Sequence, residues 1–164
     1  MVRKSIRPLV AAGAALGIGM GGFFDGILFH QILQVHNMLS AKYPADSVVN
    51  LQINMFWDGL FHVATWVMTA AGIAMLWKAT KREDVPLSTK ALIGSMAIGW
   101  GLFNLVEGII DHHILHIHHV RETPDHLIWD LAFLGSGVLL ISVGAVLVKA
   151  AARAVTVGHE TVAI

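Results

Sequence analysis

The sequence predicts an all-α fold, a four-helix transmembrane bundle built from two tandem helical hairpins. Three observations predict it: an apolar composition, four long apolar segments, and a repeat of the polar pattern along the chain. The 164 residues are 55% hydrophobic and only 13% charged, with a mean hydropathy of +0.67. Soluble domains carry about 25% charged residues. Because a hydrocarbon interior satisfies no open strand edge, the membrane segments must be helices.

Four apolar segments are long enough to cross a bilayer, which takes about 20 residues per helix. Proline residues at Pro44, Pro86 and Pro124 separate them, and proline disfavours helix in the residue before it. The expected helices cover roughly 8–39, 48–79, 87–120 and 124–153. We therefore predict a single integral membrane domain over 1–164, whose bundle projects beyond the bilayer on one side.

Basic residues set the expected orientation. Nearly all lysines and arginines lie near the two termini or in the middle loop, while only Lys42 and Arg121 lie in the other two loops. Cytoplasmic loops are enriched in basic residues. We expect a multi-pass protein with both termini in the cytoplasm and with the loops around Pro44 and Pro124 outside.

An internal repeat relates segment 8–79 to segment 87–153. A shift of 82 residues matches glycines and histidines of the first segment to those of the third, and a shift of 72 matches Asp58 to Asp130. The matched residues of the first shift are Gly17, Gly19, Gly26, His30 and His36 with Gly99, Gly101, Gly108, His112 and His118, and Asp25 falls on Glu107. Since each unit has two spans, we expect a pseudo-two-fold axis along the membrane normal.

Titratable residues concentrate in segment 107–120, EGIIDHHILHIHHV, which follows an apolar run directly. A charged side chain at bilayer depth costs at least about 2.5 to 3.5 kcal/mol, so such residues normally face the bundle interior and mark a site. The chain has no cysteine, which excludes thiolate sites and leaves nitrogen and oxygen ligands. The pattern indicates a metal site in the outer half of the bundle.

Helical spacing selects the candidate ligands, because residues three, four or seven apart share a helix face. By helical rise, four acids, one per helix, reach nearly the same height, and they could not all stay ionised there without cations. On the third helix, Glu107, Asp111 and His118 form one stripe, and His112, His116 and His119 form another. The predicted metal ligands are Asp25, His30, Asp58, His62, Glu107, Asp111, His112, His116, His126 and Asp130.

Other interpretations stay open at this stage. His118, His119 and His126 could lie in water at the outer surface, and His36 at the membrane interface. Carboxylate and imidazole ligands from four helices are similar to those of di-iron bundles, although the Glu-x-x-His spacing of that class is absent. Zinc, iron and copper(II) all accept such ligands, so the sequence leaves the metal open.

Two alternative functions remain. His30 and His112 could be the axial ligands of a b-type haem in an electron-transfer protein. Alternatively, Asp25, Asp58, Glu107 and Asp130 could relay protons or ions across the membrane. The net charge of zero gives no reason to expect nucleic acid. The expected partners are the lipid bilayer and, in an oligomer, further copies of the chain, and whether the protein is an enzyme stays undecided.

Three strings carry a resemblance to a known family: GFFDGILFHQILQVH, FWDGLFH and GLFNLVEGIIDHHILHIHHV. They resemble a bacterial family of four-helix inner-membrane proteins catalogued as a domain of unknown function, over about 13–147. The resemblance implies a bacterial inner-membrane location, with respiratory-oxidase or metal-handling proteins as partners. It also implies polar motifs at Asp25, His30, Asp58, His62, Glu107, Asp111 and His112.

Overall fold

The computed structural model describes residues 4–160 and confirms the all-α prediction for that part of the chain. Helix α1 (Arg7–Asp25) continues into the π-helical turn η1 (Gly26–Ile32), and α2 (Val48–Thr80) follows. Helix α3 (Thr89–Glu107) continues into a second π-helical turn, η2 (Gly108–Ile114), and α4 (His126–Glu160) ends the described chain. All four helices are long and apolar enough to cross a membrane.

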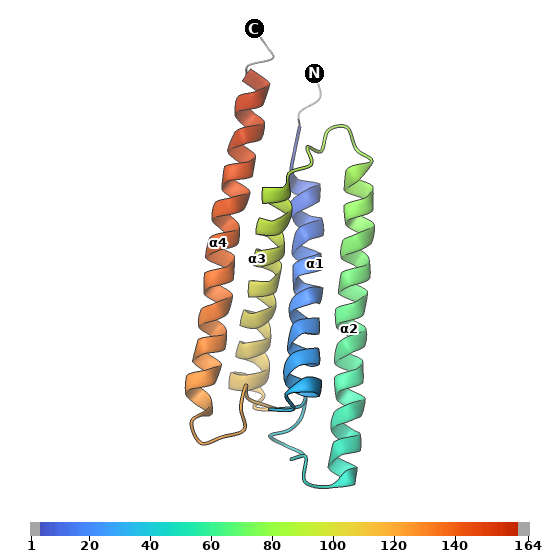
Figure 1. Cartoon of the computed structure of the whole chain (residues 1–164), viewed down its shortest axis with the longest axis vertical. Coiled ribbons are helices and arrows are strands. Elements are labelled where there is room, and N and C mark those ends of the chain that lie inside the picture. The colour runs from blue at the N-terminus through green and yellow to red at the C-terminus, as the bar shows by residue number, and fades with distance from the viewer. Residues whose placement is uncertain (1–3, 161–164) are drawn as a thin grey trace.

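The four helices stand side by side in the order α2, α1, α3, α4 (Figure 1). Contacts run between α2 and α1, between α1 and α3, and between α3 and α4. Half of the most apolar window of the first span is buried, against 11% for each of the spans of α2 and α4. Helices α1 and α3 therefore form the interior, and the apolar outer faces of α2 and α4 suit lipid.

Glycine allows α1 and α3 to approach closely. A Cβ atom added to Gly17 would lie 2.0 Å from the carbonyl oxygen of Met96, and one added to Gly99 would lie 2.0 Å from the carbonyl oxygen of Ala14. Small residues are what allow such backbone contact between membrane helices. The contact holds α1 and α3, which end at Asp25 and Glu107, against each other.

Serine residues cap the starts of α2 and α3. The hydroxyl of Ser47 accepts a hydrogen bond from the Asn50 amide at the start of α2, and that of Ser88 accepts one from the Ala91 amide at the start of α3. A side-chain oxygen at this position satisfies an amide that the helix leaves unpaired. The turn between α2 and α3 lies at the same end of the molecule as both termini, and the two longer loops lie at the opposite end (Figure 1).

The first and third helices end several residues earlier than the sequence predicts. The expected ends were residues 39 and 120, but the helical turns stop at Ile32 and Ile114. Directly afterwards, Gln34 and His116 adopt left-handed backbone conformations, with φ of 50° and 48°. Left-handed residues cannot continue a right-handed helix. The chain therefore folds back over its own helix end in both halves.

Candidate metal centre

Eight titratable side chains are buried together at the loop end of the bundle. Four are acids and four are histidines, and each has a relative exposure of 6% or less. They are Asp25, Asp58, Glu107, Asp130, His30, His36, His112 and His118. Burying a charged group without a partner is costly, so the contacts within this set decide what the site can do.

His30 lies between two carboxylates. Its Nε2 is 3.1 Å from Asp25 Oδ2, and its Nδ1 is 2.8 Å from Asp58 Oδ1. Asp25 is the last residue of α1, and His30 follows five positions later in the π-helical turn. A π-helix repeats its hydrogen bonds from residue i to residue i+5. The π-helical turn therefore brings this acid and this histidine onto one face.

His112 repeats the arrangement in the second half. Its Nε2 is 3.0 Å from Glu107 Oε1, and its Nδ1 is 3.1 Å from Asp130 Oδ1. Glu107 and His112 are again five residues apart across the start of a π-helical turn. Each half thus places one imidazole between an acid of its own helix and an acid of the next helix.

His36 and His118 cross between the two halves. Nδ1 of His36 lies 2.9 Å from the Val120 carbonyl oxygen, and Nδ1 of His118 lies 3.1 Å from the Met38 carbonyl oxygen. A carbonyl only accepts, so each Nδ1 must carry the proton. The Nε2 atoms point the other way: that of His118 is 2.8 Å from Glu107 Oε1.

His36 is held in its neutral form. Its Nε2 is buried without a hydrogen-bond partner and lies 4.0 Å from Asp25 Oδ1. Burial beside His118 and His30 lowers the pKa of His36 to about 3, because desolvation and neighbouring positive charge both disfavour the imidazolium. Neutral imidazole with Nδ1 protonated presents its Nε2 lone pair, which is the metal-binding form.

Asp58 and Asp130 are fixed by backbone amides. The Met38 amide donates to Asp58 Oδ1 over 2.8 Å, and the Val120 amide donates to Asp130 Oδ1 over 3.0 Å. Hydrogen bonds to a carboxylate favour its ionised form. Asp58 can therefore accept the Nδ1 proton of His30, and Asp130 that of His112, and each acid orients the ring it contacts.

The structure brings six of the ten predicted ligands together and leaves four outside. The six are Asp25, His30, Asp58, Glu107, His112 and Asp130. His62 Nδ1 lies 2.7 Å from the Asp58 carbonyl oxygen on its own helix, and its ring lies near those of Phe23 and Phe61. The other three are Asp111, which lines an apolar cavity of about 390 Å³, His116, which is exposed, and His126, which lies at the outer rim.

The helical stripes expected on the third helix were wrong. They assumed one regular α-helix as far as residue 120, whereas the π-helical turn changes the spacing and the helix ends at Ile114. A position in water for His118 and an interfacial one for His36 were wrong too, since these residues are 1% and 3% exposed. The matching of His36 to His118 under the 82-residue shift was the signal that could have found them.

Space for a porphyrin between His30 and His112 is missing. The His118 ring contacts both, with ring centroids 5.8 Å from His30 and 4.8 Å from His112. Both nitrogens of each candidate axial ligand also face carboxylates. A haem at this position would have to displace the His118 ring.

Two groups of side chains in the centre have the geometry to hold an ion. In each group the candidate ligand atoms lie within 4.8 Å of one another: His30, His36 and His118 form one group, and Glu107, His112 and His118 form the other. Imidazole nitrogens and carboxylate oxygens suit zinc, iron and copper(II). The donor set therefore fits a transition metal, and His118 is common to both groups.

A cavity of about 670 Å³ adjoins the centre. It is lined by His30 and Asp58 together with the amide side chains of Gln31 in η1 and of Gln34 and Asn37 in the loop that follows. The cavity therefore borders the centre on the side of the first loop.

One comparison with known proteins gives a match. A family model described as "Predicted membrane protein (DUF2243)" matches residues 12–151. No curated protein and no solved structure matches the chain.

Proposed function

The chain belongs to this family of predicted membrane proteins, and we propose that it holds one or two transition-metal ions in a buried centre at the loop end of its bundle. The ligands we propose are Asp25, His30, His36, Glu107, His112 and His118. The centre would lie in the outer half of the membrane. It would serve either metal handling or metal-dependent redox or hydrolytic chemistry.

The direction of the histidine nitrogens carries this proposal. All four buried imidazoles direct Nδ1 at an oxygen and Nε2 toward Asp25 or Glu107. With the proton on Nδ1, each Nε2 lone pair faces a carboxylate lone pair, which is repulsive. A cation bound between the two turns that repulsion into coordination.

Asp58 and Asp130 support the ligands from behind. Histidines that bind metals usually donate the other ring N–H to a carboxylate or a carbonyl, which fixes the ring and raises its basicity. Here Asp58 and Asp130 would play that part for His30 and His112. The Val120 and Met38 carbonyls would play it for His36 and His118.

A proton or ion pathway fits these contacts less well. Protons on the histidines could also neutralise the acids, but a pathway needs polar groups that continue toward the other end of the bundle. The hydroxyls of Thr65, Thr69 and Ser95 in that half bond to carbonyls of their own helices. Among the described residues, these hydroxyls therefore form no continuous hydrogen-bonded path from the centre toward the end of the bundle that holds the turn between α2 and α3.

The internal repeat accounts for the pairing of the proposed ligands. Contacts recur at a spacing of 82 residues, as with Asp25 and His30 against Glu107 and His112. We infer that units 8–79 and 87–153 are related by a pseudo-two-fold axis along the bundle. With the basic residues as guide, we also propose a bacterial inner-membrane location with both termini in the cytoplasm.

Elemental analysis of the purified protein tests the proposal. After a brief chelator wash that removes accessible ions, we expect zinc, iron or copper at one or two ions per chain, and less than half of that in Glu107→Ala and His112→Ala. His159→Ala, near the C-terminal end of the sequence, is the matched control and should retain the wild-type amount. Equal metal content in the wild type and all three variants would refute the proposed centre. A Soret absorption band in the purified protein would instead support the haem alternative.

A further inference from the structure

A second cluster of histidines lies outside the buried centre. His119 Nδ1 is 2.8 Å from Asp130 Oδ2, and His126 Nδ1 is 3.4 Å from the same oxygen. The two imidazole rings have centroids only 3.9 Å apart. One candidate ligand atom from each of the three side chains lies within 4.8 Å of the others. Two nitrogens and one carboxylate oxygen converge here.

The first half of the chain carries amides at the matching positions. The shift of 82 places Asn37 opposite His119, and the shift of 72 places Asn54 opposite His126. Asn37 Nδ2 donates to Asp58 Oδ2 over 2.9 Å, which is the contact that His119 Nδ1 makes with Asp130. Asn54 bonds to the backbone of Leu39 and Tyr43.

The matched positions therefore differ in chemistry, and at Asn54 and His126 also in burial, since Asn54 is 1% exposed and the His126 side chain 40%. The amides bond to Asp58 and the loop backbone, whereas the matching histidines place imidazole nitrogens beside Asp130. A third position agrees: the left-handed residue is Gln34 in the first half and His116 in the second. Three amides on one side correspond to three imidazoles on the other.

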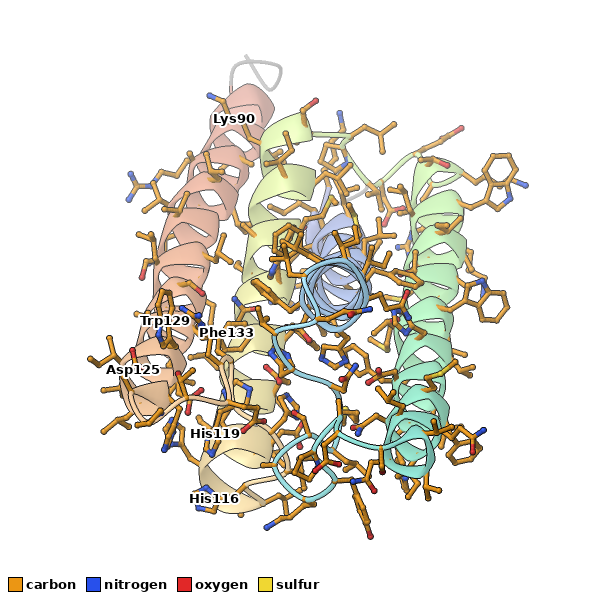
Figure 2. The ribbon with its side chains drawn as sticks, turned by 60° about the horizontal axis from the view of Figure 1, so that its bottom comes forward. Lys90, His116, His119, Asp125, Trp129 and Phe133 are labelled. Atoms are coloured by element: carbon orange, nitrogen blue, oxygen red, sulfur yellow. The ribbon has the colours of Figure 1, made fainter. Side chains whose placement is uncertain are left out.

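The histidine cluster is open to the loop end of the protein. The side chain of His126 is 40% exposed and that of His119 is 13% exposed, while Asp130 is fully buried. His116 is exposed, and its ring centroid lies 5.9 Å from that of His119. Figure 2 shows His116 and His119 at this end of the molecule, where α4 begins. An ion arriving from the water outside would meet these side chains first.

We propose that His119, His126 and Asp130 form a separate outer site for a divalent transition-metal ion such as zinc or copper(II). Imidazole and carboxylate are ordinary ligands for both ions, and a site with three protein ligands leaves a position for water or for His116. Asp130 connects this site to the buried centre, because its Oδ1 contacts His112 while its Oδ2 faces the outer histidines. The outer site stands on its own geometry and does not require the buried centre to bind metal.

The amides of the first half supply the test variant. We would purify the wild-type chain and the double variant His119→Asn/His126→Asn in detergent, titrate each with Co²⁺ and follow the visible absorption of the bound ion. Zn²⁺ stoichiometry would be measured in parallel with a colorimetric chelator. The wild type should bind one ion more than the variant, and chelator should remove that ion faster than any buried ion. Equal stoichiometry in the two proteins would overturn the outer site.

Two further variants separate this site from the buried centre and from misfolding. Glu107→Gln/His112→Gln should keep the fast, chelator-accessible ion even if the buried ions are lost, and loss of that ion as well would count against a separate site. His126→Gln changes only a partly exposed side chain, so it should fold like the wild type. This variant should lower the affinity for the rapidly removed ion at least about tenfold, and unchanged affinity would again contradict the proposal.

Discussion

The imidazole rings of His36 and His118 stack on each other, with centroids 4.9 Å apart and planes inclined by 12°. Each ring is oriented by a carbonyl from the opposite half of the chain. Two residues that are 82 positions apart in sequence thus become the middle of the buried cluster.

Replacing either stacked histidine should remove metal. We expect His36→Gln and His118→Gln to lower metal content by at least half, because each removes an Nε2 that faces the central acids. His62→Gln is the matched control, since His62 belongs to none of the three candidate ligand groups. Elemental analysis checks this, and loss of metal in His62→Gln alone would instead favour the ligand set that the sequence predicted.

Replacing the supporting acids should weaken binding in the buried centre without removing it. Asp58→Asn and Asp130→Asn leave the Nε2 ligands of that centre in place but change the group that faces Nδ1, and Asp130→Asn should in addition cost the outer site one of its three ligands. Loss of such a partner typically costs about 10- to 100-fold in metal affinity. Competition with a chelator of known affinity measures the change, and an unchanged affinity would mean that these acids do not support the ligands.

Alanine at the glycine contact should destabilise the bundle. In Gly17→Ala or Gly99→Ala the new Cβ would lie 2.0 Å from a carbonyl oxygen of the facing helix, and overpacking of this kind costs about 1 to 3 kcal/mol. A Cβ at Gly59 would meet nothing within 4 Å. Gly59→Ala should therefore be neutral or stabilise by up to about 1 kcal/mol, and thermal unfolding in detergent compares the three variants.

The left-handed turn after η1 should tolerate glycine but not a β-branched residue. Gln34 has a φ of 50°, which glycine adopts without steric cost and which valine strongly disfavours. We expect the free energy of unfolding of Gln34→Gly to lie within about 1 kcal/mol of the wild-type value, and that of Gln34→Val to fall by more than this. Equal melting temperatures for the glycine and valine variants would contradict the strained turn.

Much of the fold follows from the sequence. Composition and apolar length gave four membrane helices, and the prolines marked the loops. The start of α2 at Val48 agrees with the prediction. The early helix ends were missed because nothing in the apolar pattern of 26–32 or 108–114 distinguishes a π-helical turn from an α-helical one. That turn depends on packing and on the fold-back that follows it.

Part of the site was predictable from the regular rise of an α-helix, and the part that departs from a regular helix was not. Acids at matched heights pointed to Asp25, Asp58, Glu107 and Asp130, and these four are buried together. Helical spacing also selected His62 and His116, which lie outside the buried cluster. For His116 the reason is that the helix ends at Ile114, two residues earlier. His36 and His118 lie beyond the helix ends, where only the three-dimensional path of the chain decides what a side chain faces.

The exchange of carbonyls between the halves makes the centre a test of correct assembly. If the two hairpins docked one helical turn out of register, the Met38 and Val120 oxygens would no longer reach His118 and His36. Both imidazoles would then lose the carbonyls that orient them, while the contacts of Asp25 with His30 and of Glu107 with His112 would remain. In the proposed metal centre, an ion that needs His36 and His118 would be held tightly only after both hairpins have inserted and aligned, so metal retention would report that membrane folding is complete.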